Sequence, residues 1–259
     1  MMEIIICGCF GKMGREVFKT ALTRENTKIV AGIDRNVKKF GNVIKDSENF
    51  YVAPVFENAS QVNIKCDVII DFSSPTALDS LLEFAKKNSI ALVICATGYT
   101  QEQCDLIHEF SKNVPVFMSS NTSLAVNLLI KLAKISKQIL GNEFDIEIIE
   151  KHHNQKVDAP SGTAMMMAKS LSEKNTELVF NRTNIEGKRN SNEIGIHCIR
   201  GGTIKGEHEI IFAGLGECFT LKHVAESREI FARGALSAAE FIKSKSSGFY
   251  TMTDLMDCL

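Results

Sequence analysis

Residues 4–14 read Ile-Ile-Ile-Cys-Gly-Cys-Phe-Gly-Lys-Met-Gly, an apolar run followed at once by three glycines spaced three residues apart. A continuous apolar run that is rich in β-branched residues and bounded by turn residues is typical of a buried strand. Residues 15–23 have the apolar spacing of a helix. The stretch therefore predicts a strand, a tight glycine turn and a helix whose first N–H groups are free to hold an anion.

The same alternation of strand and helix continues to about residue 120. Strand, helix and strand in repetition produce parallel strands with helices on both faces of the sheet. We therefore expect a doubly wound, Rossmann-like parallel sheet, of the α/β class, over residues 1–122. The predicted strands cover residues 4–7, 28–33, 68–71, 91–95 and 114–118, and the predicted helices cover residues 15–23, 76–87 and 101–112.

From residue 123 the pattern changes to several strands without helices between them. Such an arrangement predicts a second, α+β domain with a mixed sheet over residues 123–228. The polar stretch at residues 173–192 is predicted to be a loop. The predicted helices cover residues 123–140 and a short segment after Pro160, and the predicted strands cover residues 145–150, 194–200, 207–212 and 217–223.

The end of the chain is predicted to return to the first domain. Residues 228–243 form an amphipathic helix that we expect to pack on that domain, so that residues 229–259 complete it. Residues 244–248 are predicted to be a linker followed by a short tail.

Composition restricts the classes of partner. The chain has 259 residues, with 30 Lys and Arg against 31 Asp and Glu, so its formal net charge of −1 gives no general attraction to nucleic acid or anionic lipid. No apolar run approaches the roughly 20 residues of a membrane span, and neither a secretion signal nor a transit peptide is recognisable. The eight cysteines lack metal-ligand spacing and predict buried, reduced thiols of a cytoplasmic protein.

The glycine turn becomes more specific when Asp34 is considered. Asp34 lies twenty residues beyond Gly14 at the end of the second strand, where a carboxylate can accept hydrogen bonds from both ribose hydroxyls of a dinucleotide. The glycines alone are equally compatible with an ordinary tight turn. A carboxylate at this position repels a 2′-phosphate, but the nearby Arg35 and Lys12 could offset the repulsion, so we expect NADPH, NADH or both.

A second informative stretch is His-His-Asn-Gln-Lys-Val-Asp-Ala-Pro-Ser-Gly-Thr at residues 152–163. The predicted strand before it leads three basic side chains, His152, His153 and Lys156, into one loop. Ser161, Gly162 and Thr163 then open a helix, whose free N–H groups make a carboxylate site. Adjacent residues in an extended segment point to opposite sides, so at most one of the two histidines carries proton chemistry. No third ligand follows at metal-binding spacing, and no metal is expected.

These residues closely resemble the signature of the 4-hydroxy-tetrahydrodipicolinate reductase (dihydrodipicolinate reductase) family. The resemblance covers nearly the whole chain. Beyond residues 152–163 it is carried by Lys12-Met13-Gly14, Asp71-Phe72-Ser73 with Pro75, Ala96-Thr97-Gly98, Asn121-Thr122-Ser123, Gly206-Glu207-His208 and residues 228–235. The chain departs from the usual family pattern at Lys12, where many members have Arg, at Cys95-Ala96 in a Gly-Thr-Thr-Gly run, and at Thr122, where an aromatic residue is frequent.

The resemblance implies a role for each matched residue. His152 would donate and accept the proton and Lys156 would be a second proton donor. The substrate would be held by His153, Ser161, Gly162 and Thr163. The cofactor would be lined by Gly8, Cys9, Phe10, Gly11, Lys12, Met13, Asp34, Arg35, Cys95, Ala96, Thr97, Ser119, Ser120, Asn121 and Thr122. The resemblance also implies a homotetramer assembled through the sheets of the second domains, with each subunit closing its two domains over the ligands.

The implied reaction is the NAD(P)H-dependent reduction of a small cyclic dicarboxylate, 4-hydroxy-tetrahydrodipicolinate, in lysine and diaminopimelate synthesis. Hydride would add to a conjugated imine, and the resulting enamine would take a proton. Histidine suits this acid because its usual pKa of about 6.5 lies near working pH. Two alternatives stay open: a two-domain amino-acid dehydrogenase of the aspartate type, and a non-catalytic NADH sensor.

Two further predictions concern residues without an assigned role. Glu147 and Glu150 are predicted to lie on a solvated strand face. His208 beside Glu207 is predicted to form a structural hydrogen-bonding pair with it.

Overall fold

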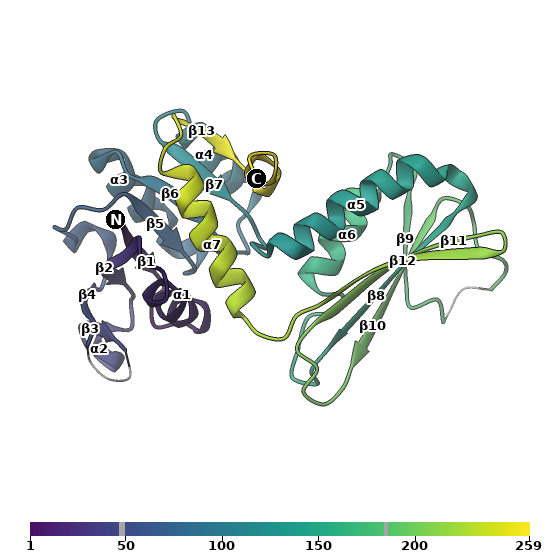
Figure 1. Cartoon of the computed structure of the whole chain (residues 1–259), viewed down its shortest axis with the longest axis horizontal. Helices are drawn as coiled ribbons and strands as arrows, with labels where there is room; N and C mark the ends of the chain where they lie inside the picture. The colour runs from purple at the N-terminus through teal and green to yellow at the C-terminus, as the bar shows by residue number, and fades with distance from the viewer. Residues whose placement is uncertain (47–49, 184–185) are drawn as a thin grey trace. The chain divides into compact units, whose positions relative to one another are not determined.

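The computed structural model describes residues 1–46, 50–183 and 186–259, and the chain folds into two compact units (Figure 1). Unit 1 comprises Met1–Leu124 together with Arg228–Leu259, and unit 2 comprises Ala125–Ser227. The chain therefore leaves unit 1 once, builds unit 2 and returns to finish unit 1.

Unit 1 is built on an eight-stranded sheet with the order β13-β7-β6-β5-β1-β2-β4-β3. Neighbouring strands are parallel except β3 and β4, which pair antiparallel. The strands are β1 (Met2–Cys7), β2 (Thr27–Ile33), β3 (Val43–Lys45), β4 (Val52–Phe56), β5 (Val68–Asp71), β6 (Ala91–Ile94), β7 (Pro115–Met118) and β13 (Gly248–Tyr250). The predicted Rossmann-like parallel sheet is confirmed, although the sequence does not predict β3, β4 or the edge strand β13.

Helices cover both faces of this sheet. They are α1 (Lys12–Leu22), the short α2 (Val37–Phe40), α3 (Leu78–Asn88), α4 (Gln101–Phe110), α7 (Glu229–Ile242) and α8 (Met252–Met256). Strand β1 shows why its sequence is continuously apolar. Ile4 and Ile6 belong to the core that includes Val17 of α1, whereas Ile5 and Cys7 belong to the other core. A strand buried on both faces has no position for a polar side chain.

The carboxyl-terminal helix α7 packs on unit 1, as predicted (Figure 1). Its Ala232, Leu236 and Ile242 are fully buried in the same core as Ile4. The stretch predicted as a linker and tail is instead structured at its end, because Gly248–Tyr250 forms strand β13 beside β7 and α8 follows. A three-residue edge strand leaves too little periodicity for detection in the sequence.

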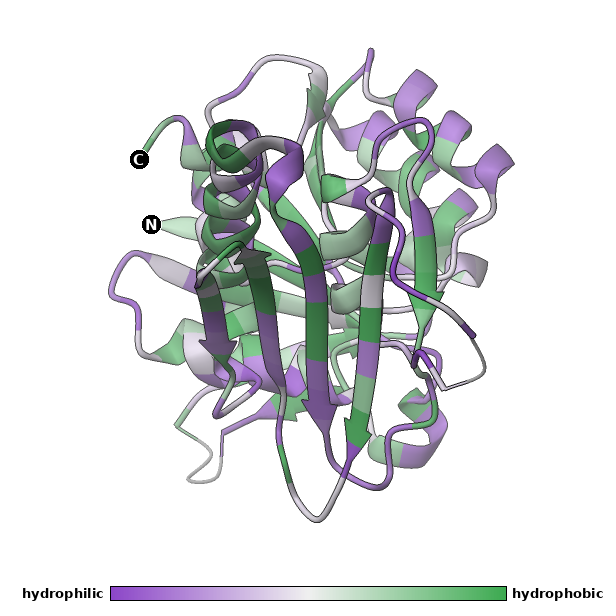
Figure 2. Cartoon of the chain, turned by 90° about the vertical axis from the view of Figure 1, so that its right-hand side faces the viewer, coloured by the Kyte–Doolittle hydropathy of each residue, from purple (hydrophilic) through white to green (hydrophobic). Residues whose placement is uncertain are grey.

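Unit 2 contains a five-stranded sheet with the order β12-β11-β8-β10-β9. The strands are β8 (Asp145–His152), β9 (Glu177–Phe180), β10 (Glu193–Arg200), β11 (Glu207–Gly214) and β12 (Glu217–Val224). Pairs β9–β10 and β10–β8 are parallel, whereas β8–β11 and β11–β12 are antiparallel, so the predicted mixed sheet is confirmed. Figure 2 looks onto unit 2 and shows hydrophobic and hydrophilic residues alternating along its strands.

Two helices, α5 (Leu124–Leu140) and α6 (Gly162–Leu171), pack on one face of this sheet. The prediction of a loop over residues 173–192 is wrong at Glu177–Phe180, which pairs with β10 as strand β9. Only one of its four side chains is buried, so the alternation that identifies a half-buried strand is weak. Residues 184–185 of the predicted loop lie outside the described residues.

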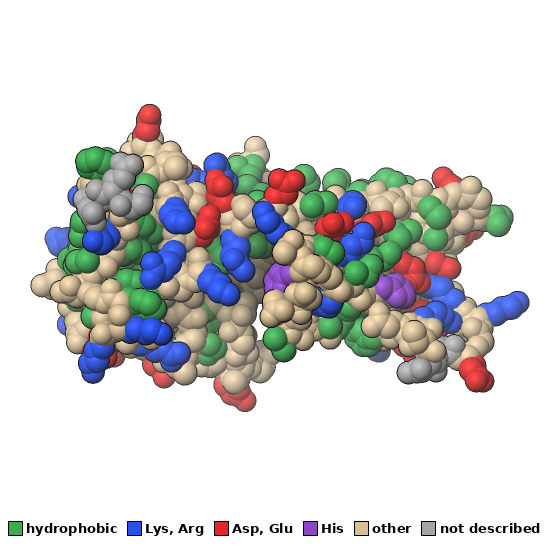
Figure 3. Space-filling model, turned by 90° about the horizontal axis from the view of Figure 1, so that it is seen from below, with side chains coloured by type: hydrophobic (Ala, Val, Ile, Leu, Met, Phe, Trp, Pro, Cys, Tyr) green, Lys and Arg blue, Asp and Glu red, His purple; other side chains and the backbone are tan. Residues whose placement is uncertain are grey.

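The surface carries charges of both signs. Figure 3 shows Lys and Arg side chains spread over the face that it presents, with Asp and Glu side chains among them. Within residues 1–46, 50–183 and 186–259, no helix has the length and apolar character needed to cross a membrane.

Candidate functional site

The glycine turn after β1 is shaped by close backbone contacts. Gly8 has a φ of +77°, and a Cβ atom there would lie 2.8 Å from the carbonyl oxygen of Phe72. A Cβ atom on Gly14 would lie 2.2 Å from the carbonyl oxygen of Gly8. Both positions therefore require glycine, the first for its conformation and both for the close approach of backbone segments.

Asp34 joins this turn to the end of β2. Its Oδ2 atom accepts a hydrogen bond from the Phe10 N–H at 2.9 Å, and its Oδ1 atom accepts from the backbone and side-chain N–H groups of Asn36, each at 2.9 Å. The side chain is buried. Because an ionised carboxylate offers about four acceptor positions, three bonds leave about one position for a ligand hydroxyl.

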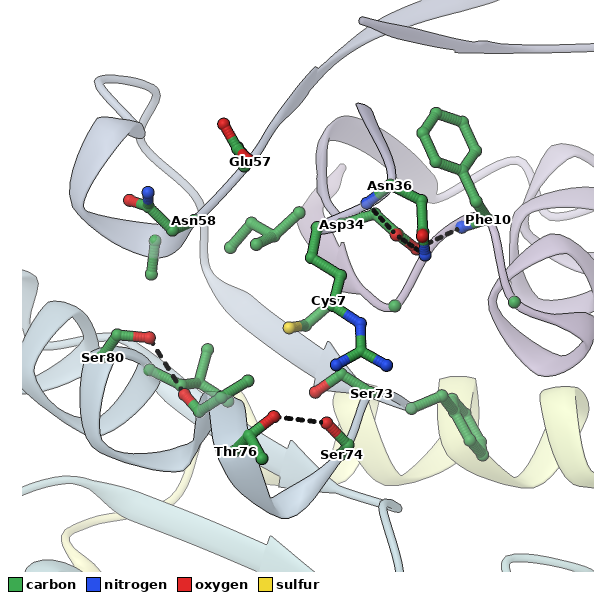
Figure 4. Close-up of a pocket in the computed structure, with 18 residues that line it drawn as sticks. Cys7, Phe10, Asp34, Asn36, Glu57, Asn58, Ser73, Ser74, Thr76 and Ser80 are labelled. Atoms are coloured by element: carbon green, nitrogen blue, oxygen red, sulfur yellow. Dashed lines mark hydrogen bonds between the residues drawn. The ribbon is translucent and has the colours of Figure 1, made fainter. Parts of the chain in front are cut away.

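A pocket of about 490 Å³ opens at the carboxyl ends of the parallel strands (Figure 4). The chain builds the sheet outward from β1 in one direction and then from β5 in the other, so the strand order reverses between these two strands. Residues at the carboxyl ends of β1 and β5 line the pocket. This reversal is the place where open α/β sheets bind ligands. Asp34 and Asn36 lie on one side of the pocket and Ser73, Ser74 and Thr76 on another. The lining comprises Cys7, Gly8, Phe10, Gly11, Ile33, Asp34, Arg35, Asn36, Glu57, Asn58, Ala59, Phe72, Ser73, Ser74, Thr76, Ala77, Ser80 and Leu81.

The pocket brings together a third of the cofactor residues predicted from the sequence. Gly8, Phe10, Gly11, Asp34 and Arg35 line it, whereas Cys9, Lys12 and Met13 are outside its lining. Cys9 is fully buried, and its Sγ atom occupies the space next to Gly32, inside the core.

The other predicted cofactor residues lie farther along the same edge of the sheet. Cys95, Ala96 and Thr97 follow β6, and the backbone N–H of Cys95 donates to the Asp71 carbonyl at 2.8 Å. Residues 119–122 follow β7, and the Ser119 N–H donates to the Ile94 carbonyl at 3.0 Å. The carboxyl ends of the neighbouring strands β5, β6 and β7 thus lie side by side along one edge of the sheet. Ser120 and Asn121 lie on it, and Thr122 donates through its Oγ1 atom to the Phe231 carbonyl at 2.7 Å.

Several lining residues were missed from the sequence, above all those of the turn after β5. Phe72, Ser73, Ser74 and Thr76 face the pocket from this turn. The buried Asp71 organises it by accepting hydrogen bonds from the Ser73 N–H at 2.9 Å and from the Tyr99 hydroxyl at 3.2 Å. Burial raises the pKa of Asp71 above its usual value. The signal was present, because these residues follow the strand next to β1 in the predicted parallel sheet.

Unit 2 gathers its chemistry at the end of β8. His152 ends this strand, and its Nδ1 atom lies 2.6 Å from Oε2 of the fully buried Glu150. Arg200 donates to both carboxylate oxygens of Glu150, at 2.6 and 2.8 Å. Burial alone would raise the pKa of Glu150, but the hydrogen bonds from His152 and Arg200 lower it to about 2. The prediction of a solvated face is therefore wrong for Glu150. Glu147 lies on the opposite face and pairs with Arg189 and His197.

The start of α6 joins the same network. The Ser161 N–H donates to Oε1 of Glu150 at 3.1 Å, and the Ser161 hydroxyl caps the helix by accepting from the Ala164 N–H at 3.1 Å. His208 Nε2 lies 2.9 Å from the same hydroxyl. Burial lowers the pKa of His208 to about 4, and electrostatic repulsion from the His152 side chain adds to this effect.

The predicted pairing of His208 with Glu207 is wrong. Glu207 is ion-paired with Lys222 instead, at 3.1 Å. Successive strand residues point to opposite faces, so the two side chains of β11 face different surroundings.

The remaining residues predicted to hold the substrate or donate a proton lie near His152 and Ser161 in the sequence. The side chain of Lys156 is ion-paired with Asp158 at 2.9 Å, and the backbone N–H of Lys156 donates to the His153 carbonyl at 3.2 Å. Within the described part of the chain, the buried Nδ1 atom of His153 has no hydrogen-bond partner. Gly162 and Thr163 form the first turn of α6, and a Cβ atom on Gly162 would meet open space.

A metal centre finds no support in the side-chain clusters. Over residues 1–46, 50–183 and 186–259, no group of three or more His, Cys, Asp or Glu side chains is placed to hold an ion. Three histidines of unit 2 are instead paired with a carboxylate or with a hydroxyl, namely His152, His197 and His208.

Comparisons with known proteins match both units. The family model for the dihydrodipicolinate reductase N-terminus matches residues 2–122, and the model for the C-terminus matches residues 125–256. The chain is 49% identical over 258 residues to a 4-hydroxy-tetrahydrodipicolinate reductase of Clostridium novyi, covering 99% of this chain and 98% of the relative. It is 45% identical over 262 residues to the corresponding protein of Clostridium tetani, covering 100% and 97%. A solved dipicolinate-bound dihydrodipicolinate reductase from Paenisporosarcina sp. TG-14 superposes with a TM-score of 0.77 at 28% identity over 97% of both chains.

Proposed function

The chain belongs to the dihydrodipicolinate reductase family, and we propose that it reduces 4-hydroxy-tetrahydrodipicolinate, via dihydrodipicolinate, to tetrahydrodipicolinate with NAD(P)H. This is a step of lysine and diaminopimelate synthesis. The observation that carries the proposal is the contact network of Glu150, His152 and Ser161. It supports the proposal because it joins the candidate acid His152 to the start of α6 within the family's C-terminal segment.

The substrate carries two carboxylates, and unit 2 supplies groups that suit them. The first turn of α6 presents N–H groups at Gly162 and Thr163, where the helix dipole favours an anion. His153 and Lys156 add basic side chains from the preceding loop. The relative from Paenisporosarcina, which was solved with dipicolinate bound, supports a planar dicarboxylate as the ligand class.

Proton transfer is assigned to His152. Loss of water from the substrate gives the conjugated imine, which then takes up one hydride, with its two electrons, and one proton. When bound, NAD(P)H supplies the hydride and leaves as NAD(P)⁺. The electron pair of the resulting enamine forms the new C–H bond with the proton of His152, and the electrons of the broken N–H bond remain on the imidazole. His152 then regains a proton from solvent. Lys156 is the second candidate donor.

The cofactor residues are assigned to unit 1. The glycine turn suits a pyrophosphate, because its backbone approaches where no Cβ atom would fit. Asp34 and Arg35 both line the pocket, so a ribose bound there would meet a carboxylate and a guanidinium. This combination supports use of both NADH and NADPH. Residues 95–97 and 119–122 and the loop residues Cys9, Lys12 and Met13 complete the proposed set.

We also propose a homotetramer assembled through the sheet of unit 2. The face of this sheet opposite α5 and α6 carries apolar side chains, among them Ile199 of β10 and Val224 of β12, which are 45% and 49% exposed. Light scattering over a range of protein concentrations should give the mass of four chains. Ile199→Asp should shift the protein to smaller species, and a monomer at every concentration would contradict the assembly.

A cytoplasmic location is proposed from the thiols. The prediction of buried thiols holds for Cys7, Cys9 and Cys95 and is wrong for Cys218 and Cys258, which are exposed. Burial raises the pKa of Cys7 and of Cys95 well above the usual value. Such side chains are typical of proteins from reducing compartments.

The activity is tested by following the absorbance of NADH and of NADPH with the freshly formed condensation product of pyruvate and aspartate semialdehyde. His152→Ala should lower kcat about 1,000-fold while leaving the dissociation constant of NADH unchanged. The control is His108→Ala, a histidine of α4 that stacks on Phe249 in unit 1. If neither cofactor is oxidised, a non-catalytic NADH sensor is favoured. Oxidation of aspartate instead would indicate an aspartate-type dehydrogenase.

A further inference from the structure

The carboxylate of Glu150 is the centre of the unit 2 network. Its Oε2 atom contacts His152 Nδ1 at 2.6 Å and Arg200 Nη1 at 2.8 Å. Its Oε1 atom contacts Arg200 Nη2 at 2.6 Å and the Ser161 N–H at 3.1 Å. These four contacts fill the roughly four acceptor positions of a carboxylate. Glu150 therefore has no acceptor position left to bind the substrate or to take up a proton during the reaction. It is fully buried beside the proposed acid.

The contacts decide which nitrogen of His152 exchanges the proton. An ionised carboxylate only accepts hydrogen bonds, so the Nδ1 atom of His152 must carry a hydrogen in every charge state. The proton that the imidazole gains and loses is then the one on Nε2. This atom lies beside Gly206, where a Cβ atom would approach it to 3.3 Å, so the absence of a side chain keeps that nitrogen uncovered.

Arg200 explains how a charge is held in this buried position. The two-pronged contact between guanidinium and carboxylate fixes the plane of the Glu150 carboxylate and compensates its charge. Arg200 is itself held by the Asp158 carbonyl, to which its Nη2 atom donates at 2.7 Å. Arg200 on β10 thus orients Glu150, and Glu150 in turn orients His152.

We propose that Glu150, held by Arg200, is a positioning residue for proton transfer: it fixes His152 as the Nδ1–H tautomer, so that Nε2 delivers the proton to the substrate. This inference rests on the proposed function for the identity of the reaction. Glu150 acts only through His152, because all of its acceptor positions are occupied by the protein. The same carboxylate also holds the Ser161 N–H, which ties the acid and the carboxylate-binding helix start to one group.

A double-mutant cycle in kcat tests this assignment. Glu150→Gln keeps the size of the side chain, but its amide oxygen should turn to Arg200, leaving the amide N–H₂ facing Nδ1 and forcing the hydrogen of His152 onto Nε2. We expect kcat to fall about 100-fold in the otherwise unchanged enzyme and less than about 2-fold when His152 is already Ala. An equal fall in both backgrounds would overturn the proposal, because it would place the effect in folding or in the helix start. An unchanged kcat in Glu150→Gln would overturn it as well.

A matched control lies on the same strand. Glu147 is also bonded to a histidine and an arginine, His197 and Arg189, but on the opposite face of the sheet. The effect of Glu147→Gln on kcat should have the same size with and without His152→Ala. If the effect of Glu147→Gln on kcat instead disappears in the His152→Ala background, as that of Glu150→Gln is expected to do, the double-mutant cycle does not distinguish the two glutamates and the proposal fails.

A second variant keeps the test decisive if Glu150→Gln does not fold, since that change leaves Arg200 facing a neutral amide. Arg200→Lys keeps both the cation and the carboxylate but loses the two-pronged contact. Its fall in kcat should be smaller than 100-fold and should again vanish in the His152→Ala background. Persistence of the fall there would count against the proposal.

A spectroscopic measurement separates this proposal from the proposed function. In protein labelled with ¹⁵N-histidine, the neutral His152 ring should show a protonated Nδ1 and an unprotonated Nε2, and Glu150→Gln should reverse the pattern. The resonances are assigned from their loss in His152→Gln. If the tautomer is as expected but His152→Ala retains full kcat, the proposed role of His152 in proton transfer fails, and only the fixing of its tautomer by Glu150 stands. The opposite tautomer in the unchanged protein overturns the positioning.

Discussion

The backbone N–H of Phe10 donates to Oδ2 of Asp34 at 2.9 Å, so the carboxylate at the end of β2 holds the glycine turn in place. Asp34 thus has a structural role in addition to the cofactor contact that we propose for it. Asp34→Ala should raise the KM for both NADH and NADPH by about 10-fold or more, because the turn loses a charged hydrogen-bond partner. Steady-state kinetics with each cofactor measure this. A variant with improved KM for NADPH would show that charge repulsion outweighs the structural contact.

Arg35 should act on one cofactor only. Its exposed side chain lines the pocket next to Asp34, where a 2′-phosphate would carry additional negative charge. Arg35→Ala should raise the KM for NADPH about 10-fold and that for NADH less than about 2-fold, because only NADPH loses a charge-assisted contact. Lys19→Ala, in the last turn of α1, removes an exposed charge of the same sign as a control. Equal changes for the two cofactors would rule out a phosphate contact.

Gly206 should matter for turnover more than for folding. A Cβ atom there would lie 3.3 Å from Nε2 and 3.6 Å from Cδ2 of His152, so the imidazole would have to shift by a few tenths of an ångström. Gly206→Ala should therefore lower kcat about 10-fold or more, since small displacements of a reacting group are costly. Gly201→Ala, whose added carbon would come no closer than 3.8 Å to any neighbour, is the comparison. Wild-type kcat in Gly206→Ala would argue against Nε2 as the reacting atom.

His208 should make the stability of unit 2 depend on pH. Its pKa is about 4 in the folded protein, against a usual value of 6.5, chiefly because of burial. Between these values the unfolded chain binds a proton that the folded chain does not, so stability is present above pH 6.5 and is lost as the pH falls towards 4. The full effect is about 3 kcal/mol. Thermal unfolding of the wild type and of His208→Gln from pH 7.5 to 4.5 measures it. The variant should lose less stability on acidification; parallel curves would assign the pH dependence to other groups.

Gly234 should be essential to the packing of α7. A Cβ atom there would lie 1.7 Å from the Thr122 carbonyl oxygen, which is backbone and cannot turn away. Gly234→Ala should destabilise unit 1 by about 2 kcal/mol or more, despite the better helix propensity of alanine. Urea unfolding monitored in unit 1 measures the change, and Ser237→Ala on the same helix should alter stability by less than about 0.5 kcal/mol. A stabilised Gly234→Ala would mean that the helix can move away without loss.

The sequence predicts the elements of this protein wherever one segment contains its own pattern. Strand β5 is predicted at its exact bounds, because a short apolar run between turn residues needs no further information. Strands β3, β9 and β13 are missed, since each is an edge strand of three or four residues that is defined by its partner rather than by periodicity. Strand β4 is missed as well, because Pro54 interrupts its short apolar run.

Glu150 shows how a residue can be misinterpreted although the signal is present. Ile146 and Ile148 are buried, and strand alternation places residues 150 and 152 on the same face. Grouping Glu150 with Glu147 ignored this alternation. Arg200, in contrast, could not be assigned, because it reaches Glu150 from a strand fifty residues away and only the β8–β10 register brings them together.

Unit 1 is interrupted in the sequence, and this has a consequence for synthesis on the ribosome. The strands of its sheet up to β7 emerge first, but Ala232 and Leu236, which cover one face of that sheet, follow only after the whole of unit 2. Unit 2 is continuous and has all of its strands once Ser227 has left the exit tunnel. The core that begins first therefore closes last. Until then its uncovered apolar face is the surface that a nascent-chain chaperone would meet.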